Sequence, residues 1–169
     1  PCCAVALLGC ALRPAALSRP PPSPRLSRPP SLVLASASPR RQELLAQLGI
    51  AFTVLPSLIP EEHPAAPPTE AIAAAALAKA RAVALQLSPD ASAVVLGADT
   101  EVVLDGRLLG KPRDAADAAR ILRALRGRGH EVITGVALVA PGGEEATAVT
   151  TRVTMRDYSD AEIEAYVAT

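Results

Sequence analysis

The sequence predicts an α/β fold with a mixed β-sheet flanked by helices, and three observations support this. Short apolar runs alternate with amphipathic helical patterns along most of the chain, as in strands joined by crossover helices. Asp105-Gly106 stands between two apolar runs and indicates a hairpin, so part of the sheet should be antiparallel. The 169 residues suffice for one domain, and an aromatic content of 2% means that Leu, Val, Ile and Ala must build its core.

Residues 1–30 differ in composition from the rest of the chain. They hold eight of the 17 prolines, all three cysteines and four arginines, and they contain no acidic residue. We expect a Pro/Arg-rich disordered tail or a transit segment there, and a single domain at residues 31–169. A tail without a targeting role would leave the protein in the cytoplasm, whereas a transit segment would direct it to a plastid or mitochondrion.

Charge, hydropathy and motifs argue against several functional classes. The 17 basic and 17 acidic residues balance, so no nucleic-acid partner is expected. No apolar run approaches the roughly 18 residues of a membrane span, so no membrane partner is expected either. Neither a Gly-Lys-Ser/Thr phosphate loop nor a G-x-G-x-x-G motif occurs. His63 and His130 are far apart in sequence, which argues against a zinc site shared by the two.

The first elements expected are a strand at residues 32–35, a helix, and a second strand at residues 51–55. Ser38 suits the helix N-cap, Pro39 the first helical position and Gly49 the C-terminal stop. Leu44, Leu45 and Leu48 should form the inward face of this helix. Residues 56–68 form a proline-punctuated loop.

An alanine-rich helix should follow, capped by Thr69 and ending near Leu87. A buried strand is expected at residues 93–97, with Ala98-Asp99-Thr100 at its carboxyl end, and then a hairpin of residues 101–104 and 107–109. The remaining elements are a helix from Asp114, strands at 132–140 and 146–155, and a helix opened by a capping box at residues 159–162.

Two places in this scheme suit chemistry. The strand-to-helix turn at residues 36–41 offers amide groups, hydroxyls and guanidiniums to an anion, although an ordinary capped helix with solvated arginines explains it equally well. Asp99 is placed at the carboxyl edge of the sheet, where it would bind a divalent cation or take a proton from water, unless it only caps a turn. Glu61 and Glu62 would complete a metal site or remain solvated loop acids.

Four motifs, in order, resemble those of one known family. Residues 34–45 read Leu-Ala-Ser-Ala-Ser-Pro-Arg-Arg-Gln-Glu-Leu-Leu and resemble the signature opening of the Maf family of nucleoside triphosphate pyrophosphatases. Residues 96–100 and 111–114 resemble its second and third motifs, and residues 125–132 with 134–136 resemble its fourth. The resemblance extends from about residue 32 to residue 169.

The resemblance implies an inosine-triphosphatase-like fold with a phosphate-binding cleft, and hydrolysis of a nucleoside triphosphate between the α and β phosphates. It also implies Mg²⁺ or Mn²⁺ as cofactor and dTTP, UTP or modified nucleotides as substrates; a homodimer is left open. By position, Asp99 falls on the catalytic base and Glu61 on a loop acid that serves metal binding and catalysis together with Asp99. Residues that fall on triphosphate-binding or base-selecting positions are Ser36, Arg40, Lys79, Thr100 and Lys111, which include the only two lysines of the chain.

The sequence departs from the family pattern in two places. The family continues past Tyr166-Val167 into Asp-Lys-Ala-Gly and Gly-Ile-Gln-Gly segments that this sequence does not contain, so we expect the C-terminal part of the domain to be missing. Pro60 replaces an acid before Glu61. Two alternatives follow: a non-catalytic nucleotide-binding module, or a metal-dependent phosphomonoesterase. Glu101, where an aspartyl-phosphate enzyme would need a second Asp, argues against one version of the latter.

Overall fold

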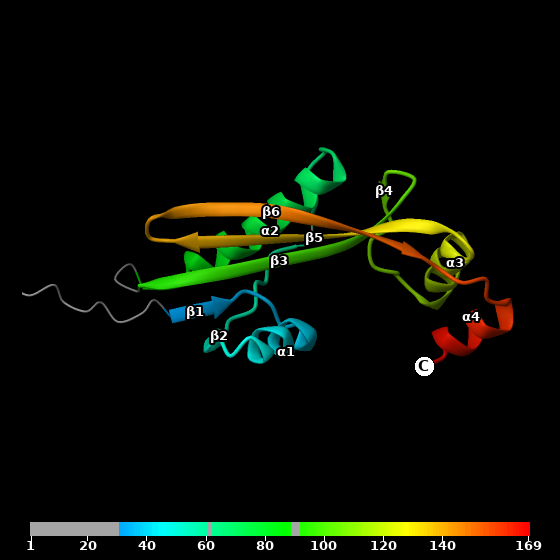
Figure 1. The fold of residues 1–169 in the computed structure, drawn as a ribbon, viewed down its shortest axis with the longest axis horizontal. Coiled ribbons are helices and arrows are strands. Elements are labelled where there is room, and N and C mark those ends of the chain that lie inside the picture. The colour runs from blue at the N-terminus through cyan, green and yellow to red at the C-terminus, as the bar shows by residue number, and fades with distance from the viewer. Residues whose placement is uncertain (1–30, 61, 89–91) are drawn as a thin grey trace, which may run out of the picture.

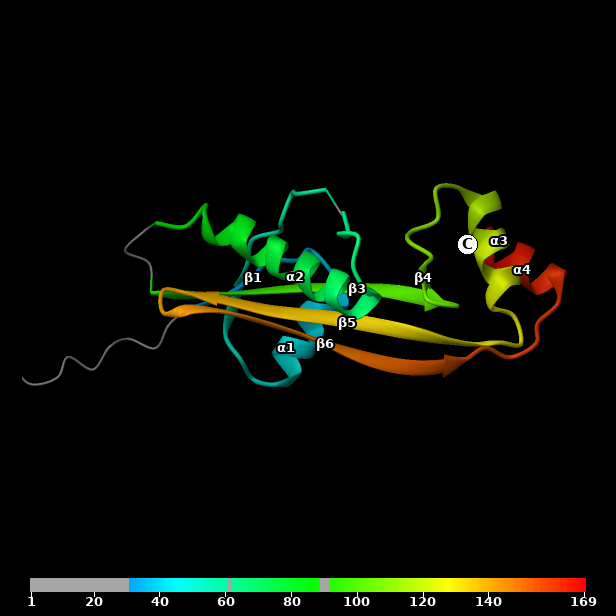
Figure 2. The same ribbon diagram turned by 90° about the horizontal axis from the view of Figure 1, so that it is seen from above.

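The structure, a computed structural model, describes residues 31–60, 62–88 and 92–169 (Figure 1). Within these residues, one six-stranded sheet combines parallel and antiparallel pairs in the order β2-β1-β3-β5-β6, with β4 paired to β3. The helices α1 (Pro39–Gln47) and α2 (Pro68–Ala84) lie on opposite faces of the sheet (Figure 2). The predicted mixed α/β architecture is confirmed, while the expected tail at residues 1–30 lies outside the described residues.

The N-terminal unit consists of β1 (Ser31–Leu34), α1 and β2 (Phe52–Val54), with β1 parallel to both β2 and β3. Ser38 is the N-cap of α1 and Pro39 its first residue, as predicted, but the Ser38 side chain makes no capping hydrogen bond. Of the three leucines expected to face inward, only Leu45 is buried, whereas Leu44 and Leu48 are exposed, so that part of the prediction is wrong.

The long helix α2 packs closely on β3 (Ala93–Leu104) and β5 (Gly129–Ala140), and small residues on both sides allow this. A Cβ atom at Gly97 would overlap the carbonyl oxygen of Ala76, and one at Gly135 would overlap that of Ile72. The helix starts at Pro68, with Pro67 in place of the predicted Thr69 as N-cap, and ends at Ala84, before the predicted Leu87. This close packing holds the next turn of α2, with Lys79, against the sheet.

We expect Gly97→Ala to lower the free energy of unfolding by about 2–3 kcal/mol, because the new methyl group must push the α2 backbone away from β3. Gly142→Ala is the matched control: it has open space around its Cβ position and should change stability by less than about 0.5 kcal/mol. Urea unfolding of the two variants beside the parent chain measures both effects. Equal stability of the two variants would show that α2 does not pack this closely on the sheet.

One predicted boundary is wrong: residues 93–104 form a single strand, β3, that continues through Asp99. The polar Ala-Asp-Thr sequence interrupts the apolar pattern, but β5 pairs with β3 from Val95 to Val103 and keeps the backbone extended. Asp99 therefore lies inside a strand. It does lie beyond the end of β1, whose last residue, Leu34, is opposite Leu96.

The remaining elements agree with the prediction apart from their ends. The β3–β4 hairpin turns at Asp105 and Gly106, which have φ values of 51° and 74°, and β4 is Arg107–Leu108. The helix α3 (Ala115–Leu125) follows the N-cap Asp114, and β5 pairs with β6 (Gly143–Thr154) along its full length. The capping box of Ser159 and Glu162 opens α4 (Asp160–Val167), which lies beside α3 beyond the end of the sheet. Among the described helices, none has the length and apolar character that crossing a membrane requires.

Candidate active site

A cavity of about 520 Å³ opens beside the middle of β3, past the end of β1. Its walls come from the turn after β1, the loop after β2, the helix α2, the strand β3 and the loop after β4. The volume lies within the range of small-molecule sites. The structure brings five of the site residues expected from the sequence together in its lining: Ser36, Lys79, Asp99, Thr100 and Lys111.

Arg41 organises one wall of this cavity. Its Nη1 donates hydrogen bonds to Ser36 Oγ at 2.9 Å and to the carbonyl oxygen of Ala98 at 3.0 Å, and its Nη2 donates to Thr100 Oγ1 at 3.3 Å. The Thr100 hydroxyl lies 3.2 Å from that of Thr134 on β5. Arg41 thus links the turn after β1 to the part of β3 that extends beyond β1, and it orients the hydroxyl groups of Ser36 and Thr100.

The expected residue Arg40 is exposed and does not line the cavity, so its role in binding remains a prediction. Arg41 was expected only as one of the two guanidiniums of the turn at residues 36–41, and it takes the inward position because it lies one helical turn before the buried Leu45. The sequence does not distinguish the two arginines, because Arg40 has the same i, i+4 relation to Leu44, which was also expected to face inward and is exposed.

Asp99 lies at the centre of a buried charge cluster. Its Oδ1 accepts a hydrogen bond from Lys79 Nζ at 2.6 Å, its Oδ2 lies 2.7 Å from His63 Nε2, and the residue is only 3% exposed. Burial by itself opposes ionisation, but the bonds from Lys79 and His63 outweigh it and hold the pKa of Asp99 below its usual value. Asp99 is therefore a carboxylate at neutral pH.

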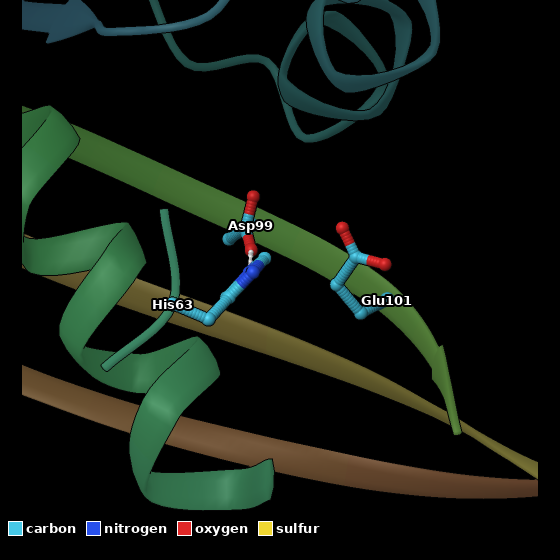
Figure 3. Close-up of side chains that lie close together, drawn as sticks. All are labelled: His63, Asp99 and Glu101. Carbon is cyan, nitrogen blue, oxygen red and sulfur yellow. Dashed lines mark hydrogen bonds and ion pairs between the residues drawn. The ribbon is translucent and has the colours of Figure 1, made fainter. Parts of the chain in front are cut away.

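Two residues that the sequence does not single out for the site, His63 and Glu101, lie next to Asp99 (Figure 3). Glu101 is two residues along the same strand, on the same face as Asp99, and it is 8% exposed. The period of two along a strand is the signal that would have identified it. His63 has no such local signal, because it is 36 residues before Asp99 and reaches it only through the fold.

The side chains of the cavity fit a phosphorylated ligand together with a divalent cation. Arg41, Lys79 and Lys111 supply positive charge, while Asp99 and Glu101 supply buried carboxylates that would repel a phosphate approaching alone. A divalent cation held by the carboxylates would remove that repulsion, and oxygen ligands suit Mg²⁺ and Mn²⁺. Glu61, the other expected metal ligand, lies outside the described residues.

Known proteins resemble this chain along most of its length. The family model described as Maf-like protein matches residues 31–169. A dTTP/UTP pyrophosphatase of Moorella thermoacetica is 57% identical over 141 residues, which are 82% of this chain and 71% of that protein. A dTTP/UTP pyrophosphatase of Koribacter versatilis is 49% identical over 139 residues, which are 82% of this chain and 70% of that protein.

Among solved structures, the Ham1 protein of Staphylococcus aureus has a similar fold. The two structures agree with a TM-score of 0.50 over 77% of this chain and 72% of that one. With 16% sequence identity, the likeness concerns the fold alone and supports the same mixed α/β architecture.

Proposed function

Because the chain belongs to the Maf family, we propose that it is a nucleoside triphosphate pyrophosphatase that hydrolyses dTTP or UTP to the monophosphate and pyrophosphate. Its named relatives act on these two nucleotides. The observation that carries the proposal is the position of Asp99, a buried carboxylate in a cavity whose other walls hold Lys79, Lys111 and Arg41. Such a cavity places a carboxylate that can orient water next to cationic side chains that can bind phosphates.

The cationic side chains bind and orient the triphosphate. Lys79 and Lys111 offset the charge of the phosphates and of the pyrophosphate as it leaves, and such charge stabilisation is a large part of catalysis. Arg41 holds Ser36 and the turn before α1, where backbone amides at a helix start favour an anion. We retain Arg40 as a further binding residue, on the resemblance to the family pattern.

Asp99 holds the attacking water and receives its proton. In the structure described here Asp99 is a weak base, because its bonds to Lys79 and His63 lower its pKa. A bound triphosphate competes for the Lys79 ammonium. When Lys79 turns towards the phosphates, Asp99 loses one of the interactions that lower its pKa and becomes a stronger base. Its basicity would thus increase only when substrate is present.

The residues that would hold a divalent cation here are Asp99 and Glu61, as the sequence predicts, with His63 and Glu101 beside Asp99. A cation such as Mg²⁺ or Mn²⁺ held there would supply positive charge that offsets the charge of the phosphates, and it would make a nearby water more acidic. Base selection involves Thr100, whose side chain is on the other face of β3 from Asp99 and Glu101 and whose hydroxyl lies between Arg41 and Thr134.

We expect the purified chain, with Mn²⁺ or Mg²⁺, to convert dTTP and UTP into dTMP or UMP plus pyrophosphate as the initial products. Chromatography of the first few per cent of turnover measures this, with CTP as the matched control for UTP, because the two differ only at the C4/N3 edge of the base. The CTP reaction should be slower than that of UTP. Initial release of dTDP and orthophosphate would instead identify a phosphomonoesterase and refute the proposal.

A further inference from the structure

Three side chains of different origin converge at the α2-facing side of β3. Asp99 and Glu101 come from the strand, and His63 comes from the loop that leads into α2 (Figure 3). One ligand atom from each residue lies within 4.8 Å of the others. In the part of the chain that the structure describes, no other group of histidine, cysteine and acidic side chains meets this condition.

The spacing of these atoms is close to what one cation requires. Nitrogen and oxygen ligands bind first-row divalent ions at about 2.0–2.2 Å, so two ligands of one ion are at most about 4.4 Å apart. His63 Nε2 and Asp99 Oδ2 are 2.7 Å apart, so these two atoms need to separate by only a few tenths of an ångström to become neighbouring ligands of one ion. The upper bound of 4.8 Å on all three separations exceeds that limit by only a few tenths of an ångström.

The surroundings of the three residues also favour metal binding, because the side chains are largely buried and Asp99 is held in place by a hydrogen bond. The exposed fractions are 3% for Asp99, 8% for Glu101 and 15% for the His63 side chain. Lys79 bonds Asp99 Oδ1, which fixes the carboxylate and directs its other oxygen, Oδ2, towards His63. Hydrogen bonds of this kind to the distal atom of a ligand are typical of protein metal sites.

The types of ligand atom indicate which cations the site should prefer. Mg²⁺ binds oxygen ligands and usually retains several waters, whereas imidazole favours transition metals. We propose that His63, Asp99 and Glu101 bind a first-row transition cation such as Mn²⁺ or Co²⁺ in preference to Mg²⁺, with His63 Nε2 as the nitrogen ligand. This inference deepens the proposed function, since Asp99 belongs to both, but it concerns which ion binds and through which atom.

His63→Ala is the first test, measured by calorimetric titration of Mn²⁺, Co²⁺ and Mg²⁺ into the untagged, nucleotide-free chain. We expect Mn²⁺ and Co²⁺ affinity to fall by about 10–100-fold or more, and Mg²⁺ affinity by less than about threefold. His130→Ala is the matched control, because it removes the only other histidine, on β5, and should leave all three affinities unchanged. Unchanged Mn²⁺ and Co²⁺ affinity in His63→Ala, or an equal loss for Mg²⁺, would overturn the inference.

A second test uses the unaltered chain and does not depend on the folding of a variant. With two histidines, the imidazole nitrogen spectrum contains two sets of signals, which the His130→Ala chain assigns. Co²⁺ should give His63 Nε2 a large contact shift, which requires a direct metal–nitrogen bond, and should leave the His130 signals near their diamagnetic positions. The absence of a contact shift at His63 Nε2 would show that His63 serves only as a hydrogen-bond partner of Asp99. Neither test requires turnover, so a failure of this inference and a failure of the proposed hydrolysis are separable.

Discussion

Asp99→Asn is expected to lower the turnover of dTTP by about 10²–10⁴-fold, the range for a positioned acid–base group. The substitution keeps the shape of the side chain and an oxygen for the Lys79 hydrogen bond, but it removes the negative charge that orients and deprotonates water. Because Lys79 loses a buried ionic partner, we also expect the free energy of unfolding to fall by about 1–3 kcal/mol. The nucleotide should still bind, since Lys79 and Lys111 remain.

The control for this change is Asp105→Asn, at the exposed turn of the same hairpin. Asp105 pairs with Arg128 and has a left-handed φ of 51°, which asparagine adopts readily. The Asp105→Asn variant should turn over dTTP as fast as the parent chain does. Turnover per folded molecule and thermal unfolding, measured on one preparation of each variant, distinguish a catalytic role of Asp99 from a purely structural one. Normal turnover with lowered stability in Asp99→Asn would mean that Asp99 only supports the fold.

Lys79→Met is expected to lower stability at neutral pH by about 3–5 kcal/mol, because it leaves the Asp99 carboxylate buried without its cationic partner. Methionine fills a similar volume, so the loss reports the charge and not a cavity. Arg81→Met is the matched control, two residues along α2, where an exposed ion pair with Glu144 is removed and little change is expected. Urea unfolding in a chelating buffer measures both variants.

The loss of stability in Lys79→Met should depend on pH, and the pKa of Asp99 determines the direction of that dependence. In the parent chain the pKa of Asp99 is below its unfolded value of 3.8, so its contribution to stability is present above that value and is lost as the pH falls through the lower folded pKa. Without Lys79 the pKa of Asp99 is higher than in the parent chain, because only His63 then opposes the effect of burial. The stability gap between Lys79→Met and the parent chain should therefore narrow from pH 7 towards pH 4. A gap that stays constant would mean that Lys79 stabilises the fold independently of Asp99.

Local signals in the sequence predicted most of the fold. Each of these signals acts over a few residues and marks the end of an element in the structure. They are Ser38 with Pro39 at the start of α1, Asp105-Gly106 at the hairpin turn, and Ser159 with Glu162 at the start of α4. The mistake at Asp99 has a long-range cause. Pairing with β5, more than 30 residues away, extends β3 through a polar sequence that the local pattern interprets as a strand end.

The candidate site shows the same division. The family motifs predicted Ser36, Lys79, Thr100 and Lys111 as site residues, and the structure places all four with Asp99 in the lining of one cavity. The orientation of Arg41 follows from the phase of α1, which only the buried Leu45 reveals. His63 could not be placed from the sequence, because its approach to Asp99 depends on how the loop before α2 returns over the sheet.

Hydrolysis of dTTP in water enriched in ¹⁸O tests the central claim most directly, with mass spectrometry of all products. Water oriented by Asp99, with Lys79 and Lys111 stabilising an intact pyrophosphate leaving group, attacks the α phosphorus. The account therefore predicts one ¹⁸O atom in each dTMP and none in the pyrophosphate. Label in pyrophosphate, or in orthophosphate released beside dTDP, would contradict it.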